Sequence, residues 1–193
     1  MKAILPAATV LALTACPVFA GVGVGSAASL AMGAAHPLTG VDHVAVMVAV
    51  GLWAALKGGR ALWVWPATFV GAMLIGGALG AAHVPLPYVE PAIGASVVAL
   101  GILVALVIDL PTWAGVLLIV AFAVFHGHAH GSAIADTLSV AEYLAGFAVA
   151  TALLHALGIG FALLMTRVHL RPVIRVAGLA CVLVGAGLFA GVF

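Results

Sequence analysis

Long apolar runs separated by short polar connections divide the chain into segments that predict membrane-spanning helices. About 17–25 mostly apolar residues cross the hydrocarbon core of a bilayer. Six such segments fit after the N-terminal region, over residues 41–56, 61–82, 91–108, 112–130, 140–165 and 172–193. A run of small residues, 21–35, precedes the first segment. The connections are short, as in "KGGR" and "RVHLR", so no soluble domain fits between the predicted helices.

The composition supports the same class. Hydrophobic residues make up 66% of the chain and charged residues 6%, and the mean hydropathy is +1.39. A soluble protein carries about a quarter charged residues, so this chain cannot cover a water-facing surface. We therefore expect an all-α polytopic membrane protein with the lipid bilayer as its surroundings. The net charge of +1 and the lack of a basic patch argue against a nucleic-acid partner.

The N-terminus predicts a cleavable signal peptide over residues 1–20, followed by one six-helix domain over residues 21–193. Lys2 is a short basic region, residues 3–15 are apolar, and the small-residue site at Ala20 precedes the predicted cleavage. Two other interpretations stay open. The "LTAC" of residues 13–16 loosely resembles a lipoprotein box, and the segment is also compatible with an uncleaved first helix.

The basic residues predict the orientation in the membrane. All six occur in three places, namely Lys2, Lys57 with Arg60, and Arg167 with Arg171 and Arg175. Lys and Arg are enriched on the cytoplasmic side. Placing these groups there predicts a bacterial inner-membrane protein with the mature N-terminus and the C-terminus in the periplasm. The stretches "HPLTGVDH" (36–43) and "FHGHAHG" (125–131) then meet at the outer face.

The stretch "HPLTGVDH" combines a helix break with side chains that bind metals. Pro37 and Gly40 favour a break, which would hold His36 against the first turn of the next helix, where Asp42 and His43 lie. Imidazole and carboxylate suit Ni²⁺, Co²⁺ and Zn²⁺. The plainer interpretation is that Asp42 caps the helix and His36 sits at the interface. Ionisable groups within a membrane are costly and usually functional, which favours a metal site.

Further candidates extend this site. Met47 lies four residues after His43, so its thioether would share a helix face with His43 and extend the site inward. His126 and His130 also have the i, i+4 spacing that lets two imidazoles bind one ion. His128 lies about 200° round the helix from His126 and should point elsewhere, unless the neighbouring glycines loosen the helix. A histidine-rich loop that catches metal nonspecifically is the alternative.

Other polar residues carry weaker signals. His155 in the fifth predicted helix is either a hydrogen-bonding partner for another helix or a second station on an ion path. Glu90 precedes Pro91 and is either a helix cap or an outer attraction point for cations. Pairs of glycines four apart predict tight helix packing and also allow a homo-oligomer; they are Gly76 with Gly80, Gly127 with Gly131, and Gly187 with Gly191. An inverted three-plus-three repeat is compatible with the histidine placement.

Two sequence stretches resemble a known family. "HPLTGVDHVAVMVAVGLWAA" (36–55) and "FHGHAHG" (125–131) resemble the two signatures of the HupE/UreJ family of nickel or cobalt permeases. The resemblance implies a six-helix permease with a cleavable signal that imports Ni²⁺ or Co²⁺ without nucleotide hydrolysis. By position it implies the following metal-handling residues: His36, Asp42, His43, His126 and His130, with Glu90 and His155 at family-typical positions. Members often carry a glutamate where this chain has Ser132 and Ala133.

The leading hypothesis is therefore a transporter with Ni²⁺ or Co²⁺ as its substrate and with no cofactor or enzymatic activity. The first alternative is a membrane metalloenzyme, but neither histidine stretch contains the glutamate of an H-E-x-x-H site. The second is an electron carrier that binds haem between two histidines. Nickel and cobalt have overlapping ligand preferences, so the residues predict either ion.

Overall fold

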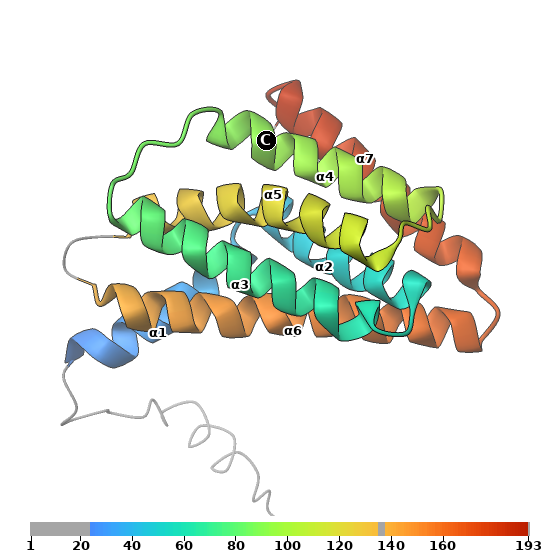
Figure 1. Ribbon diagram of the computed structural model, residues 1–193, viewed down its shortest axis with the longest axis horizontal. Coiled ribbons are helices and arrows are strands. Elements are labelled where there is room, and N and C mark those ends of the chain that lie inside the picture. Colours follow the sequence, from blue (N-terminus) through green and yellow to red (C-terminus); the bar gives the residue numbers. More distant parts are fainter. Residues whose placement is uncertain (1–23, 135–137, 193) are drawn as a thin grey trace, which may run out of the picture.

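The structure, a computed structural model, describes residues 24–134 and 138–192, and all regular secondary structure in these ranges is helical (Figure 1). The helices are α1 (Val24–Ala35), the short 3₁₀ helix η1 (His36–Leu38), α2 (Val41–Lys57), α3 (Ala61–Ala81), α4 (Val89–Ala105), α5 (Thr112–Ser132), α6 (Val140–Arg167) and α7 (Arg171–Phe189). The all-α prediction is confirmed. The predicted signal peptide, residues 1–20, lies outside the described residues.

Several of these helices can cross a bilayer. Four of them, α3, α5, α6 and α7, are long and apolar enough to span it alone. The segments Ala27–Leu38 and Val41–Lys57 together pass the same test as one span bent by 81°. Helix α4 is apolar but has 17 residues, at the lower end of spanning length. These helices support a multi-pass membrane protein with four or five candidate spans, and the sixth span and the inverted repeat stay predictions.

The helix starts follow the sequence pattern closely, with two differences. Helix α4 begins at Val89 rather than at Pro91, because a proline fits the first turn of a helix, where no backbone N–H is needed. Residues 24–35 of the small-residue run form a separate helix, α1, which was not predicted. Helix α1 lies against the start of α6, where Gly33 meets the backbone of Tyr143 and Gly146 meets that of Leu30.

The bundle has two chemically different ends. At the end we call the histidine end, α2, α4 and α6 begin and α5 and α7 finish. At the opposite end, which we call the basic end and which lies to the right in Figure 1, Lys57 pairs with Asp109 at 2.5 Å. Trp53 and Trp65 stack there with ring centroids 4.0 Å apart. Their indole N–H groups donate to the carbonyls of Ile108 and Thr112, which fastens the α4–α5 connection.

Glycines bring α5 into backbone contact with α3. A side chain at Gly127 would collide with the carbonyl oxygen of Met73, and one at Gly131 with that of Gly77. The predicted tight packing is confirmed for these helices. The suggestion that these glycines loosen α5 is wrong, because the helix continues through Ser132 and the glycine face is filled by α3. That face is occupied within the chain, and a homo-oligomer stays a prediction.

We expect Gly127→Ala to destabilise the protein, because the added methyl group has no space between α5 and the backbone of α3. Overpacking of this kind costs about 1–3 kcal/mol. Gly71→Ala, also on α3, is the matched control, because nothing lies within 4 Å of the added atom. Thermal unfolding of the purified protein in detergent measures both. Equal stability of the two variants would contradict the contact.

Candidate functional site

The break before α2 is formed by neighbouring backbone and side-chain bonds. Pro37 lies within the 3₁₀ turn that follows α1. The Thr39 hydroxyl and amide both donate to the carbonyl of His36, at 2.7 and 3.1 Å. Gly40 then adopts an extended conformation, with φ −99° and ψ 122°, as the N-cap of α2. The predicted break is confirmed, and it places His36 beside the first turn of α2.

Histidines from three elements meet at the histidine end. The ring of His130 lies 4.7 Å from that of His36 and 4.2 Å from that of His43, measured between centroids. The ring of His126 lies 5.1 Å from that of His43. These four residues form what we call the histidine cluster. The structure thus brings together the two stretches that the sequence singled out, although they lie far apart in the chain.

The cluster is rich in nitrogens without partners. His126 and His130 are buried, at 0% and 2% exposure. Within the described residues, no hydrogen-bond partner is present for several buried nitrogens: Nε2 of His43, Nδ1 of His126, and both ring nitrogens of His130. Each buried unpaired polar group costs about 1–3 kcal/mol. A fold that keeps several of them together is suited to binding a ligand that they can share.

The ring nitrogens of the cluster are not directed toward one shared ion position in this structure. Their planes meet at 67°, 82° and 90° in the three pairs, so they pack edge to face. In the part of the chain that the structure describes, no group of three or more His, Cys, Asp or Glu side chains could hold an ion as it stands. Rotation of the side chains would be needed to turn their nitrogens toward a shared position.

Asp42 orients one member of the cluster. Its Oδ1 lies 2.8 Å from Nδ1 of His43. An ionised carboxylate only accepts hydrogen bonds, so Nδ1 of His43 donates, and in the neutral ring Nε2 is the nitrogen with the lone pair. The interpretation of Asp42 as a simple helix cap is not supported, because the N-cap Gly40 carries no side-chain bond and Asp42 bonds the histidine.

Ser96 on α4 contacts a second member, and the sequence analysis did not identify it. Its Oγ lies 2.8 Å from Nε2 of His126, and both residues are fully buried. A lone hydroxyl in an apolar helix is a weak signal, because serine is common at tight helix contacts. Only the packing of α4 against α5 shows that this hydroxyl meets a histidine.

Two predicted residues lie outside the cluster. His128 points away from it, as its position on the helix predicted, and its Nε2 lies 2.7 Å from the carbonyl oxygen of Val84. It therefore anchors the connection that follows α3. Met47 is completely buried among the apolar residues of the core. Its sulfur has no recorded contact with the cluster, so a role in the site stays a prediction.

His155 lies deeper along α6, on the far side of an aromatic ring. The Phe69 ring is 5.9 Å from that of His126 and 5.1 Å from that of His155, between centroids. His155 is buried, and neither of its nitrogens has a partner among the described residues. The interpretation of His155 as a hydrogen-bonding partner for another helix is therefore not supported. Phe69 was missed because a phenylalanine in an apolar run carries no distinguishing signal.

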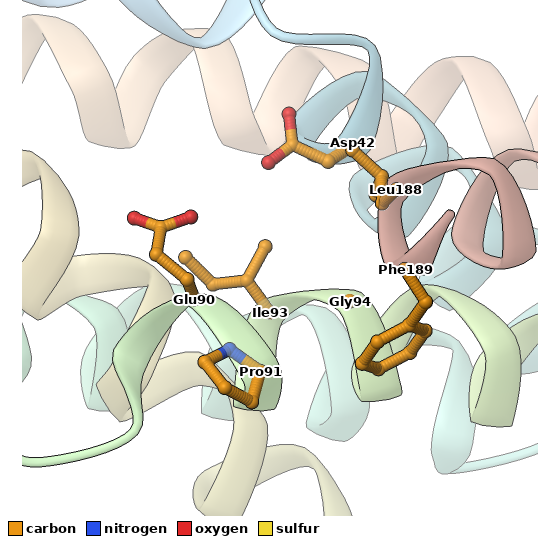
Figure 2. Close-up of a pocket in the computed structure, with 7 residues that line it drawn as sticks. All are labelled: Asp42, Glu90, Pro91, Ile93, Gly94, Leu188 and Phe189. Atoms are coloured by element: carbon orange, nitrogen blue, oxygen red, sulfur yellow. The ribbon is translucent and has the colours of Figure 1, made fainter. Parts of the chain in front are cut away.

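A cavity adjoins the cluster at the histidine end. Its volume is about 310 Å³, and it is lined by Asp42, Glu90, Pro91, Ile93, Gly94, Leu188 and Phe189. Figure 2 shows the carboxylates of Asp42, from α2, and Glu90, from α4, on opposite sides of this cavity. Asp42 thus borders both the cavity and the histidine cluster.

The fold and this site define a helical, multi-pass membrane protein with a buried histidine cluster beside a carboxylate-lined cavity. The family model described as HupE / UreJ protein matches residues 9–188, so the chain belongs to that family. It is 44% identical over 184 residues to Protein HupE of Rhizobium leguminosarum bv. viciae, covering 95% of this chain and 96% of that protein. The resemblance noted in the sequence is confirmed. No solved structure matches the chain.

We expect His130→Leu to raise the thermal stability of the metal-free protein. Leucine has a similar volume, and the change removes two buried nitrogens without partners, each costing about 1–3 kcal/mol. His128→Leu, two residues earlier on the same helix, removes one unpaired nitrogen, Nδ1, but also the bond of Nε2 to Val84, so it should not raise stability as His130→Leu does. Unfolding in detergent with a chelator present compares them. A lower unfolding temperature for His130→Leu than for the wild type would contradict the conclusion that both ring nitrogens of His130 are buried without partners.

Proposed function

We propose that this protein carries Ni²⁺ or Co²⁺ across the bacterial inner membrane without nucleotide hydrolysis. The observation that carries the proposal is the histidine cluster, whose buried nitrogens lack protein partners beside Asp42. Membership of the HupE/UreJ family supports the same class, since that family is associated with nickel and cobalt transport. The ion is the substrate, and its ligands would be His36, Asp42, His43, His126 and His130.

The chemistry of the cluster suits a transported ion. Imidazole nitrogens and carboxylate oxygens bind divalent ions of this part of the first transition series. A transported ion must bind well enough to lose water and weakly enough to leave. Edge-to-face rings that need to rotate before they converge favour a temporary site over a permanent one. The energy of rotation would weaken binding, and weak binding permits release.

A route through the protein follows from the order of the polar groups. A hydrated cation would first meet Glu90 and Asp42 in the cavity, and then the histidine cluster. Phe69 separates the cluster from His155, which would be the next station toward the basic end. The positive-inside tendency assigns the basic end to the cytoplasm and both termini to the periplasm. The route then runs inward, as uptake requires.

The geometry disfavours the haem alternative. Two axial histidines must stand on opposite faces of a porphyrin, whereas the rings of His43 and His130 contact each other directly at 4.2 Å. No space for a macrocycle remains between them. The enzyme alternative also lacks support, because the carboxylates near the cluster, Asp42 and Glu90, face a cavity at the end of the bundle, and relatives in this family are transporter-like permeases.

We expect His43→Ala and His130→Ala to abolish nickel and cobalt accumulation in cells at unchanged protein level, because each removes a central ring of the cluster. The control is His83→Asn. His83 is exposed outside the cluster with φ 54°, and asparagine tolerates that conformation. Metal content of cells expressing each variant is the measurement. Normal uptake by both alanine variants would reject the assigned site.

We expect the purified protein in liposomes to move Ni²⁺ or Co²⁺ without ATP. A negative interior potential should speed the entry of a divalent cation, since each charge gains about 2.3 kcal/mol per 100 mV. Parallel assays with Ni²⁺, Co²⁺, Zn²⁺ and Mg²⁺, with and without a potassium diffusion potential, identify the ion and the driving force. Loss of transport in His130→Ala liposomes controls for leakage. Movement of none of these ions would refute the proposed function.

A further inference from the structure

Two short contacts of Ser96 determine where its single hydroxyl proton lies. Ser96 Oγ is 2.6 Å from the carbonyl oxygen of Ile93 and 2.8 Å from Nε2 of His126. Two oxygens this close are joined by a hydrogen bond, and a carbonyl has no proton to donate. The hydroxyl must therefore donate to Ile93. Having no second proton, Ser96 can only accept from His126.

This assignment determines the tautomer of His126. If Ser96 accepts, then Nε2 of His126 carries the hydrogen, and Nδ1 of the neutral ring keeps its lone pair. Nδ1 is buried and has no partner among the described residues. Buried imidazoles that ligate metals usually donate their other N–H to a fixed acceptor. Here the acceptor is a hydroxyl that the first turns of α4 hold in place through the carbonyl of Ile93.

We propose that Ser96 is a positioning residue that holds His126 as its Nε2–H tautomer and presents the Nδ1 lone pair to the ion. The proposal rests on the proposed function for the identity of the ion. Asp42 acts on His43 in the complementary way, since it accepts a hydrogen bond from Nδ1–H and leaves Nε2 free. The two neighbouring rings, 5.1 Å apart, would thus offer nitrogens of opposite type to one site.

The link also joins helices. Ser96 belongs to α4 and His126 to α5, while the carboxylates of Glu90 and Asp42 line the cavity next to this contact. A hydroxyl on a helix is a more rigid acceptor than water. Loss of such an outer partner typically weakens metal binding by about 10–100-fold. Serine at this position is therefore more than a small residue that permits close packing.

The tautomer is testable in the full-length, metal-free protein. Nitrogen NMR of the protein with ¹⁵N-labelled histidine rings distinguishes protonated from bare nitrogens, and loss of a signal in His126→Gln assigns that residue. We expect the wild-type His126 to show a protonated Nε2 and a bare Nδ1. In Ser96→Ala the Nε2 hydrogen has no acceptor, so a mixture of tautomers should appear. Ser96→Thr keeps the hydroxyl and should restore the single form.

Metal binding provides the second readout. Titration with Co²⁺ should show about 10–100-fold weaker binding in Ser96→Ala, with recovery in Ser96→Thr. Ser132→Ala is the matched control, because the Ser132 hydroxyl also donates to the carbonyl three residues earlier, at 3.0 Å. That hydroxyl has no recorded contact with a histidine, so this variant should behave as the wild type.

The outcomes separate the two proposals. A protonated Nδ1 on wild-type His126 overturns the role of Ser96, whatever the protein transports. An unchanged tautomer and unchanged Co²⁺ affinity in Ser96→Ala overturn it as well. A wild-type protein that binds neither Co²⁺ nor Ni²⁺ overturns the proposed function. In that case the ring spectrum alone decides whether Ser96 sets the tautomer.

Discussion

The backbone contact between α5 and α3 is the constraint on which the histidine cluster depends. Gly127 and Gly131 must face α3, because any side chain there would collide with its carbonyls. Residues on either side of a glycine point about 100° away in opposite directions. His126 and His130 consequently face His43 on α2, and His126 also meets Ser96 on α4, while His128 faces the connection after α3 and bonds Val84. One packing requirement thus separates the cluster histidines from the structural one.

The buried histidine nitrogens without hydrogen-bond partners lower the stability of an otherwise apolar bundle. The hydrophobic core of the described residues is filled by apolar side chains, and the indole N–H groups of Trp53 and Trp65 within it have carbonyl partners. The cluster and His155, in contrast, keep buried nitrogens unpaired. Asp42 and Ser96 each satisfy one nitrogen of one ring and leave the other nitrogen free. Partial satisfaction limits the loss of stability and leaves lone pairs that the proposed ion would use.

The surroundings of the histidine cluster differ between its two sides, with carboxylates toward the cavity and aromatic rings toward the core. Phe147 packs against His130 with ring centroids 3.9 Å apart, and Phe69 lies between His126 and His155. The approach from the cavity is lined by the carboxylates of Asp42 and Glu90, which attract cations. Beyond the cluster, the proposed route passes Phe69, and aromatic rings attract cations through their quadrupoles. This order of carboxylates, histidines and aromatic rings is compatible with the proposed transport, in which an ion is bound briefly and passed along.

The sequence by itself determined the class, most helix boundaries and the two histidine stretches that meet in the cluster. Long apolar runs with few charges favour helices, because a helix pairs its backbone N–H and C=O groups within the segment in lipid. Helical spacing also predicted that His128 points away from His126 and His130. Tertiary structure alone decided that α1 is a separate helix, that Asp42 bonds His43 rather than capping α2, and that Ser96 and Phe69 belong beside the histidines. A hydroxyl or a phenyl ring acquires such a role only from the helix packed against it, and packing partners distant in the chain leave no periodic trace in the sequence.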